Sequence, residues 1–286
     1  MASKKTRVAI AYDFDGTLAP GNMQEHSFLP ELGLTAKEFW PEVKQYAHDN
    51  DMDEILAYMY LMLKKATSSN RPIKREAIEE YGRTVKLFPG VEEWFDTISH
   101  YGKERDLTIE HYIISSGLRE MISATSIGKK FRYIFASGYM YDPNDVAVWP
   151  ALAVNYTTKT QYLFRINKGI QNSYNNIEIN KYTPEPERPI PFKNMIYLGD
   201  GETDIPCMKM LKYQGGHSIA VYEPWNGRGK KKQLAKRDLC LELLEQERAD
   251  YVAAGDYSSG TNLDSIIKSL LDKMSIEAKL TKLKKP

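Results

Sequence analysis

The sequence contains only two cysteines, Cys207 and Cys240, in 286 residues. They are too few for a disulfide framework, and they lack the short spacing of a zinc-binding or redox pair. We therefore expect a reducing, cytoplasmic setting. The sequence also has no excess of one charge, because 39 basic and 38 acidic residues leave a formal net charge of +1. This balance argues against nucleic acid or an anionic membrane surface as a partner.

Long apolar runs are also missing. No segment approaches the roughly twenty apolar residues that span a bilayer. Asp13 and Asp15 interrupt the first apolar stretch, which a signal peptide core would not tolerate. With 42% hydrophobic and 11% aromatic residues, the chain can still bury a sizeable core in one large domain or two modest ones. The basic runs at 228–232 and 279–285 suit a solvated helix start and a frayed tail.

The segment VAIAYDFDGTL at residues 8–18 is the most informative part of the sequence. Its apolar run is short and rich in strand-forming residues, so it predicts a buried parallel strand that ends in Asp13 and Asp15. Open α/β sheets bind ligands at that end of their strands. Two carboxylates so close together are costly unless a cation lies between them or one is protonated. Either condition is useful in catalysis.

The rest of the chain divides into a helical segment and an alternating one. Residues 29–87 are helical in pattern and poor in strands, which indicates an inserted module. Thr35 is expected to cap a first helix, Pro41 to open the next, and residues 54–64 to form an apolar helix in its centre. After residue 88 we expect strands at 109–114, 131–136, 195–198 and 217–221, and helices at 118–125, 160–170, 202–211 and 264–271. This alternation predicts an α/β fold with a Rossmann-like parallel sheet core, helices on both faces and an inserted α-helical cap.

Three further segments place polar residues at strand ends or helix starts. Ser115 and Ser116 follow a predicted strand and precede Gly117, so hydroxyls and backbone N–H groups can face an anion. Lys159 stands where a helix should begin, which is electrostatically poor unless a nearby anion is bound. Asp200 and Asp204 lie in an acidic, glycine-flanked loop after another strand. Such hard oxygen ligands favour Mg²⁺.

The order of these motifs, DFDGT, strand-Ser, Lys and GDGETD, resembles the haloacid dehalogenase-like superfamily and, within it, the phosphatases related to phosphoserine phosphatase. The resemblance covers residues 6–19 and 88–225, while the helical insertion is similar to that family's first type of cap by position and character. It implies a catalytic core at 1–19 and 88–275, a cap at 20–87 and a basic C-terminal tail at 276–286.

The resemblance also implies roles for the motif residues. Asp13 would be the nucleophile that forms an aspartyl-phosphate, and Asp15 the general acid and base. The phosphate-binding residues would be Thr17, Ser115, Ser116 and Lys159, and the Mg²⁺ site would use Asp13, Asp15, Asp200 and Asp204. An aspartate at position 15 favours phosphoryl transfer, because a halide leaving group needs no proton.

The sequence departs from the pattern in two places. Ser116 replaces a glycine that is usual in the phosphoserine phosphatases, and residues 169–192 form an Asn- and Pro-rich surface excursion. Lys168 is a second candidate for the motif lysine, but its position suits a helix C-terminus, so Lys159 is preferred. These departures weaken any transfer of substrate identity.

The predicted function is a Mg²⁺-dependent phosphatase of a small phosphorylated metabolite. Gln24, Glu25 and His26 follow the catalytic loop, where related phosphatases carry specificity residues, so we expect one or two of them to contact the substrate. Two alternatives stay open. A phosphotransferase or sugar phosphomutase would use the same motifs, and a catalytically silent binding or regulatory protein could retain the same fold.

Overall fold

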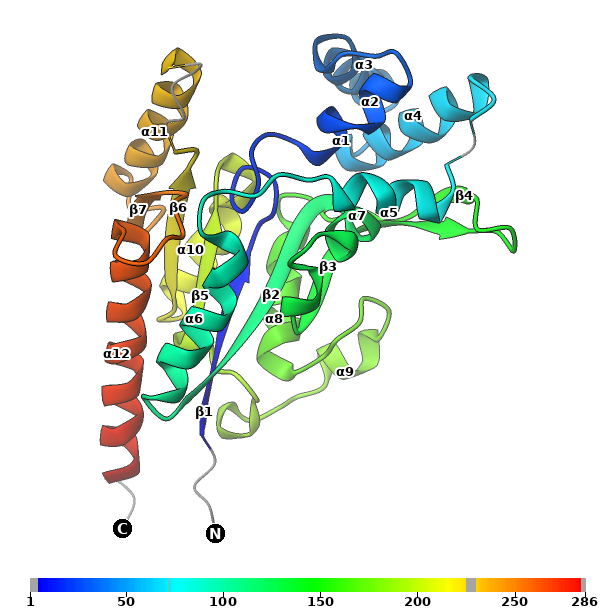
Figure 1. Ribbon diagram of the computed structural model, residues 1–286. Helices are drawn as coiled ribbons and strands as arrows, with labels where there is room; N and C mark the ends of the chain where they lie inside the picture. The colour runs from blue at the N-terminus through cyan, green and yellow to red at the C-terminus, as the bar shows by residue number, and fades with distance from the viewer. Residues whose placement is uncertain (1–4, 72, 225–229, 284–286) are drawn as a thin grey trace.

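The computed structural model describes residues 5–71, 73–224 and 230–283. A seven-stranded sheet in the order β4-β3-β2-β1-β5-β6-β7 forms its centre (Figure 1). The strands are β1 (Thr6–Tyr12), β2 (Leu107–Leu118), β3 (Tyr133–Tyr141), β4 (Ala147–Leu152), β5 (Met195–Gly199), β6 (His217–Tyr222) and β7 (Tyr251–Ala254). All neighbouring strands are parallel except β4, which runs antiparallel to β3.

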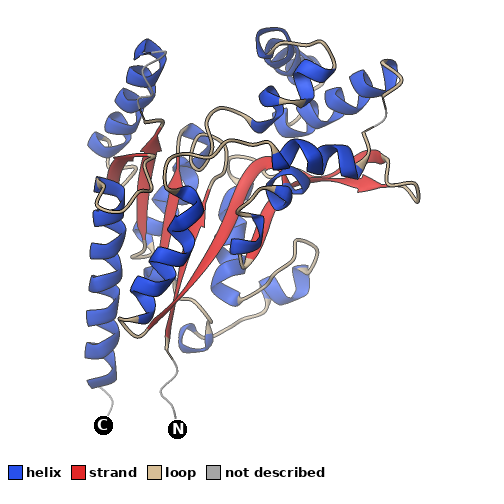
Figure 2. Ribbon diagram, viewed as in Figure 1, coloured by secondary structure: helices blue, strands red, loops and turns tan. Residues whose placement is uncertain are grey.

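Helices cover both faces of the sheet (Figure 2). Alternate residues of β1 point to opposite faces, and each face is buried under helices. Val8, Ile10 and Tyr12 belong to one buried cluster, and Ala9 and Ala11 belong to the other. The first cluster includes residues of α6 (Val91–Lys103) and α12 (Asn262–Leu283), and the second includes residues of α8 (Thr158–Lys168), α10 (Ile205–Tyr213) and α11 (Lys230–Glu245). The predicted parallel sheet with helices on both faces is therefore confirmed.

A group of helices lies beyond the carboxyl ends of the central strands, at the top of Figure 1. It consists of α1 (Met23–His26), α2 (Phe28–Glu31), α3 (Ala36–Asp49), α4 (Glu54–Ser68) and α5 (Arg75–Arg83). The Thr35 backbone N–H donates to Glu38 Oε2 at 3.0 Å at the start of α3. The prediction that Pro41 opens a new helix was wrong, because α3 continues through it. An exposed proline interrupts only the bond to the carbonyl four residues earlier, and packing of the buried Phe39 and Val43 holds the helix together.

The prediction from sequence missed the edge strands β4 and β7, the long helix α11, and the short helices α1 and α9 (Asn176–Asn180). The helix expected at 118–125 is α7 (Arg119–Ala124). Arg228 and Gly229 of the basic run lie outside the described residues, and α11 begins at Lys230. The C-terminal residues expected to fray instead continue α12 as far as Leu283. None of the described helices combines the length and apolarity needed to cross a membrane.

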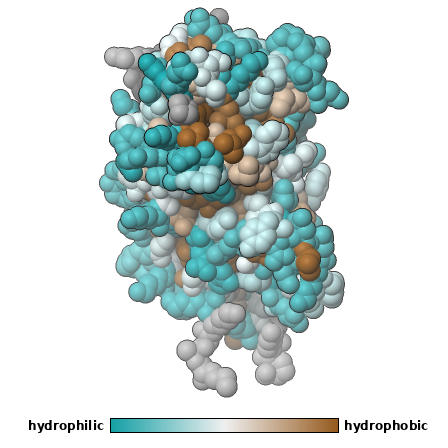
Figure 3. Space-filling model, turned by 90° about the vertical axis from the view of Figure 1, so that its right-hand side faces the viewer, coloured by the Kyte–Doolittle hydropathy of each residue, from teal (hydrophilic) through white to brown (hydrophobic). Residues whose placement is uncertain are grey.

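The β3–β4 hairpin extends from the sheet to the helical group. Ala147 donates its backbone N–H to the Ile73 carbonyl at 2.8 Å, and Arg75 donates its backbone N–H to the Asp145 carbonyl at 3.0 Å. Figure 3 shows the face of the molecule on which the hairpin lies. Hydrophobic residues gather in its upper half, and the residues around them are hydrophilic. The hairpin therefore ties a segment before residue 88 to one well after it, which the sequence pattern did not indicate.

Residues 169–192 form a surface excursion beside α8. Arg165 is buried, and its guanidinium donates to the backbone carbonyls of Asn172 and Ser173 at 2.9 and 3.2 Å. Lys168 Nζ donates to the carbonyls of Ile179 and Lys181 at 2.5 and 2.6 Å. Lys168 is therefore bound to the excursion at the C-terminus of α8.

Candidate active site

The carboxyl ends of β1, β2 and β5 meet at one cavity of about 330 Å³. Parallel strands place their carboxyl ends at the same edge, which explains why segments far apart in sequence converge there. The residues that line it from the sheet are Asp13, Asp15, Gly16, Ser115, Ser116, Gly117, Asp200 and Thr203, with Lys236 from α11 and Tyr156 from the loop before α8. The helical group adds Gly21, Asn22, Gln24, Glu25, Trp40, Ile55 and Tyr58. The cavity thus has a catalytic side built from the sheet and a cap side built from α1, α3 and α4.

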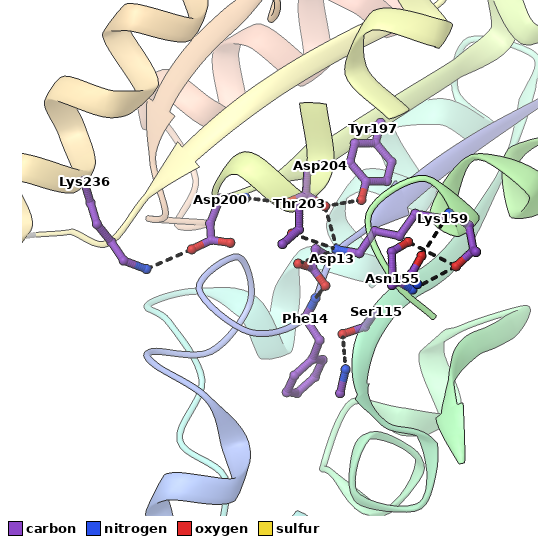
Figure 4. Close-up of polar contacts among 12 residues, drawn as sticks. Asp13, Phe14, Ser115, Asn155, Lys159, Tyr197, Asp200, Thr203, Asp204 and Lys236 are labelled. Atoms are coloured by element: carbon purple, nitrogen blue, oxygen red, sulfur yellow. Dashed lines mark hydrogen bonds and ion pairs between the residues drawn. The ribbon is translucent and has the colours of Figure 1, made fainter. Parts of the chain in front are cut away.

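Asp13 is almost completely buried at the end of β1, with 5% of its surface exposed. Its Oδ1 accepts a hydrogen bond from the Phe14 backbone N–H at 2.7 Å, and its Oδ2 lies 2.9 Å from Lys159 Nζ (Figure 4). Burial raises the pKa of Asp13 to about 7, although the charge of Lys159 acts in the opposite direction. The carboxylate is fixed by these two donors and still faces the cavity, as a nucleophile must.

Asp15 lies beside Asp13 on the same loop and is partly buried. Its Oδ1 accepts a hydrogen bond from the Met23 backbone N–H at 3.0 Å, at the start of α1. Burial and, after it, the charge of Asp13 raise the pKa of Asp15 well above its ordinary value. A raised pKa favours the protonated carboxyl group, which can donate its proton to a leaving group.

Lys159 is fully buried at the second position of α8, where its ammonium group bridges two carboxylates. Its Nζ lies 2.7 Å from Asp204 Oδ1, in addition to its contact with Asp13. Burial disfavours the charged form, but the Asp13 and Asp204 carboxylates outweigh it and raise the pKa of Lys159. The lysine is therefore a fixed positive charge beneath the cavity.

Asp204 is fully buried, and both of its oxygens are engaged. Oδ1 accepts from Lys159 and from the Tyr197 hydroxyl at 2.5 Å, and Oδ2 accepts from the Asp200 backbone N–H at 3.1 Å (Figure 4). These bonds orient Lys159 and the loop that carries Asp200. In this arrangement Asp204 suits a supporting role better than direct metal ligation.

Asp200 completes an acidic group that suits a metal ion. Oxygens of Asp13, Asp200 and Asp204 lie within 4.8 Å of one another. Carboxylate oxygens are the ligands that Mg²⁺ prefers. Asp200 Oδ2 also forms an ion pair with Lys236 Nζ at 2.8 Å. Burial raises the pKa of Asp200, against the lowering effect of Lys236.

Two glycines allow the acidic residues to approach the backbone. Gly16 has a φ of +73°, and a Cβ at this position would lie 2.1 Å from Asp200 Oδ2. A Cβ on Gly199 would lie 2.4 Å from Asp204 Cγ. Substitution at either position would push a carboxylate out of the site.

The predicted phosphate-binding residues differ in their surroundings. Ser115 Oγ is buried and accepts from the Gly117 backbone N–H at 3.1 Å. Ser116 Oγ is buried and has no hydrogen-bond partner among the described residues, so it is available for a ligand in the cavity. Thr17 Oγ1 is also buried without a described partner, but Thr17 does not line the cavity. Lys159 lies behind Asp13 and likewise does not line it.

The three candidate specificity residues do not share one position. Gln24 and Glu25 line the cavity, whereas His26 does not. His26 Nε2 lies 2.9 Å from the Pro20 carbonyl oxygen on the exposed side of the loop. Gln24 is 2% exposed, and its Oε1 has no partner among the described residues. The geometry therefore favours Gln24 and Glu25 as substrate contacts over His26.

Sequence reasoning missed several residues that shape the site. Lys236 comes from α11, and nothing in its local sequence distinguishes it from the other lysines there. Tyr197 and Tyr58 are ordinary strand and helix residues by pattern, yet Tyr197 binds Asp204, and the Tyr58 hydroxyl donates to the Ser116 carbonyl at 2.8 Å. Asp53, which caps α4, accepts a hydrogen bond from the Asn155 side-chain amide in the loop before α8. Tertiary packing alone brings these partners together.

Comparison with known proteins agrees with this geometry. The family model described as haloacid dehalogenase-like hydrolase matches residues 10–209. An uncharacterized protein of Borreliella burgdorferi is 28% identical over 287 residues, which cover 92% of this chain and 96% of the relative. Among solved structures, a HAD family hydrolase of Salmonella enterica subsp. enterica serovar Typhi matches with a TM-score of 0.56 and 16% sequence identity. The match covers 96% of this chain and 74% of the hydrolase chain.

A phosphoserine phosphatase, solved as a phospho-aspartyl intermediate analogue, matches with a TM-score of 0.52 and 17% sequence identity. The match covers 93% of this chain and 99% of the phosphatase chain. At these identities the two solved structures support the fold, and the family match supports the hydrolase assignment independently. The match covers well over half of the sequence and includes the segments that carry Asp13, Ser115, Lys159 and Asp200. The chain belongs to the haloacid dehalogenase-like hydrolase family.

Proposed function

We propose that this protein is a Mg²⁺-dependent phosphatase that hydrolyses a small phosphorylated metabolite through an aspartyl-phosphate. The observation that carries this proposal is the convergence of Asp13, Asp15 and Asp200 on one cavity, with Lys159 Nζ 2.9 Å from Asp13 Oδ2. A fixed carboxylate nucleophile, a neighbouring proton donor and a buried cation are the groups that phosphoryl transfer from an ester requires.

Asp13 and Asp15 divide the chemistry. A carboxylate oxygen of Asp13 attacks phosphorus, the bond to the ester oxygen breaks, and the leaving alkoxide takes the proton of Asp15. The Asp15 carboxylate then takes a proton from water, whose oxygen attacks phosphorus and breaks the bond to Asp13. Phosphate leaves, and both aspartates return to their starting forms. The raised pKa of Asp15 supports the first proton transfer at neutral pH.

Hydroxyl groups hold the phosphate, and the ammonium group of Lys159 supports the nucleophile. Ser115 and Ser116 lie at the end of β2 beside the cavity, and Ser116 Oγ has no described protein partner. Lys159 neutralises Asp13, so that the nucleophile can approach an anionic phosphate without strong repulsion.

Asp13, the Asp15 carbonyl and Asp200 are the groups that we propose for the Mg²⁺ site, with Asp204 in support. The ion would neutralise charge on the transferring phosphoryl group. Lys236 competes for Asp200 Oδ2 in the present arrangement, so metal binding requires this ion pair to loosen.

We further propose that residues 20–87 act as the cap. Their helices carry Gln24, Trp40 and Tyr58, which line the cavity opposite Asp13. A cap over the site excludes bulk water and favours small substrates over macromolecules.

The test is release of inorganic phosphate from a panel of small phosphomonoesters, with and without Mg²⁺. We expect release that depends on Mg²⁺ and is abolished in Asp13→Asn. Asp96→Asn is the matched control, because this aspartate is 74% exposed on α6 and the same substitution there should leave release unchanged. Trapping of phosphate on wild-type Asp13, detected by mass spectrometry, would identify the intermediate.

Two alternatives have distinct outcomes in the same experiment. A phosphotransferase or phosphomutase would move the phosphoryl group to an added alcohol or sugar phosphate rather than to water. A silent binding protein would bind the esters without turnover. Either result would contradict the phosphatase proposal.

A further inference from the structure

The cap side of the cavity contains an unpartnered acceptor. Gln24 is 98% buried, since 2% of its surface is exposed, and its Oε1 has no hydrogen-bond partner among the described residues. It lines the same cavity as Asp13. A buried carbonyl oxygen without a donor is costly, and a ligand that carries N–H or O–H groups would remove this cost.

Glu25 adds a negative charge to the same side. Its Oε1 accepts from the Asn22 side-chain amide at 2.7 Å and from the Trp40 indole N–H at 2.7 Å. Both bonds use one oxygen, so Oε2 has no donor among the described residues. The two donors fix the carboxylate without neutralising its charge.

Aromatic rings stand beside these acceptors. Trp40 and Tyr58 pack edge to face, with ring centroids 6.0 Å apart and an interplanar angle of 71°. Both line the cavity, as does Tyr156. A carboxylate next to aromatic faces attracts a cation, because the ring quadrupole and the charge act in the same direction.

No described residue of the cap side carries a positive charge. Among the described residues that line the cavity, Lys236 is the only lysine or arginine, and it pairs with Asp200 on the catalytic side. A carboxylate on the leaving group would therefore face Glu25 with no cationic partner among these residues, which is unfavourable. This arrangement argues against an amino acid such as serine as the alcohol.

We propose that the substrate is the phosphate monoester of an ammonium-bearing alcohol of the ethanolamine or choline type. Glu25 attracts the positive charge of either alcohol, and Trp40 and Tyr58 contact the carbon atoms beside the nitrogen. Gln24 Oε1 accepts an N–H only from the primary ammonium of the ethanolamine type, and it faces the charge of the choline type as a dipole. The cavity of about 330 Å³ is close to the lower limit of roughly 300 Å³ for ligand pockets, which suits so small a molecule. This inference rests on the proposed phosphatase function.

The test compares phosphocholine and phosphoethanolamine with 3,3-dimethylbutyl phosphate, an uncharged isostere of phosphocholine, and with phosphoserine. We expect kcat/KM for phosphocholine or phosphoethanolamine to exceed that for the isostere by about tenfold or more, from the charge and cation–π contacts together. In Glu25→Gln, which keeps an acceptor for Trp40 and Asn22, this ratio should fall severalfold, to the part that the aromatic rings alone supply. Glu76→Gln, an exposed glutamate of α5, is the control and should keep the wild-type ratio.

Two further measurements separate this inference from the phosphatase proposal. Hydrolysis of p-nitrophenyl phosphate without any preference for the ammonium esters, or with phosphoserine or a sugar phosphate as the best substrate, would overturn the inference and leave the phosphatase intact. Calorimetric binding to Asp13→Asn reports recognition without turnover. If no ester is hydrolysed but phosphocholine binds about tenfold more tightly than its isostere, recognition is supported and the phosphatase proposal fails.

Discussion

The two sides of the cavity are held together by different interactions. On the catalytic side, Asp13, Lys159 and Asp204 are almost fully buried and bound to one another by short polar contacts. On the cap side, Glu25 is only partly buried, Gln24 Oε1 and Glu25 Oε2 lack described donors, and aromatic rings supply much of the wall. The buried charges of the catalytic side are paired without a ligand, whereas the cap side leaves an unpaired charge and unpartnered acceptors for one.

This difference matches the roles that we propose, chemistry for the catalytic side and substrate selection for the cap side. Buried charges are tolerated only when each is paired, so the catalytic network resists rearrangement. The cap side has fewer mutual contacts and can change its residues at lower cost to folding. We therefore expect substitutions on the catalytic side to affect both stability and turnover, and those on the cap side to affect mainly substrate choice.

The largest effect should come from Lys159→Met. This change leaves Asp13 and Asp204 buried without their cation, which is expected to cost about 3–5 kcal/mol of the free energy of unfolding and to lower kcat by about a thousandfold or more. Urea unfolding and phosphate release measure the two quantities. Lys209→Met, on the exposed side of α10, should change neither. Near-normal turnover in folded Lys159→Met would refute the role given to this lysine.

A smaller loss is expected for Tyr197→Phe. The variant removes the hydroxyl that donates to Asp204 Oδ1 at 2.5 Å and keeps the ring, so the free energy of unfolding should fall by about 1.5–3 kcal/mol. Turnover should fall less than in Lys159→Met, because Lys159 still holds Asp204. Tyr182→Phe is the control, since Tyr182 is 83% exposed. Equal stability of both variants would show that the Tyr197 hydroxyl does not support the network.

Lys236→Met tests how the catalytic side binds the metal ion. Removing the ammonium group frees Asp200 Oδ2 and removes a positive charge, so Mg²⁺ should bind about fivefold more tightly, in line with about 1 kcal/mol for a partly exposed charge at this range. Calorimetric titration with Mg²⁺ and the Mg²⁺ concentration that gives half-maximal turnover both measure it. Weaker binding would mean that Lys236 positions Asp200 rather than competing for it.

The smallest effect is expected for Tyr58→Phe, at the junction of the two sides. The variant loses the hydrogen bond from the Tyr58 hydroxyl to the Ser116 carbonyl, which connects α4 to β2. The net contribution of such a bond to the free energy of unfolding is about 0.5–1 kcal/mol. We expect KM to rise about two- to fivefold while kcat stays near that of the wild type. A large fall in kcat with unchanged KM would place Tyr58 on the catalytic side instead.

Much of the catalytic side could be predicted from the sequence. Asp13 and Asp15 follow a strand whose apolar pattern is unmistakable, and Asp200 follows another, so the edge of a parallel sheet brings them together. Lys159 was identified because a lysine is unfavourable at a helix start. The helical group at 29–87 was also visible, since its apolar residues recur at helical spacing and strand patterns are few.

On the cap side, the position of Gln24 and Glu25 after the catalytic loop was informative, but the aromatic residues there and the long-range contacts could not be predicted. Lys236 lies 36 residues after Asp200, and Tyr58 lies 58 residues before Ser116. Nothing in the local sequence of either residue specifies its partner. Strand β4 was missed because only its pairing with β3 and its contact with Ile73 make it a strand, and Pro41 was misjudged because packing outweighs one lost hydrogen bond.

The sequence by itself determined the order of the central strands and the helices between them, the family and the residues that end the strands at the site, because these depend on local periodicity and on short motifs. Only the tertiary structure decided that Asp204 supports Lys159, that Lys236 pairs with Asp200 and that Glu25 stands beside Trp40 in the cavity. These relations depend on where separate elements dock. Docking is set by the packing of the whole core, and no short segment of the chain encodes it.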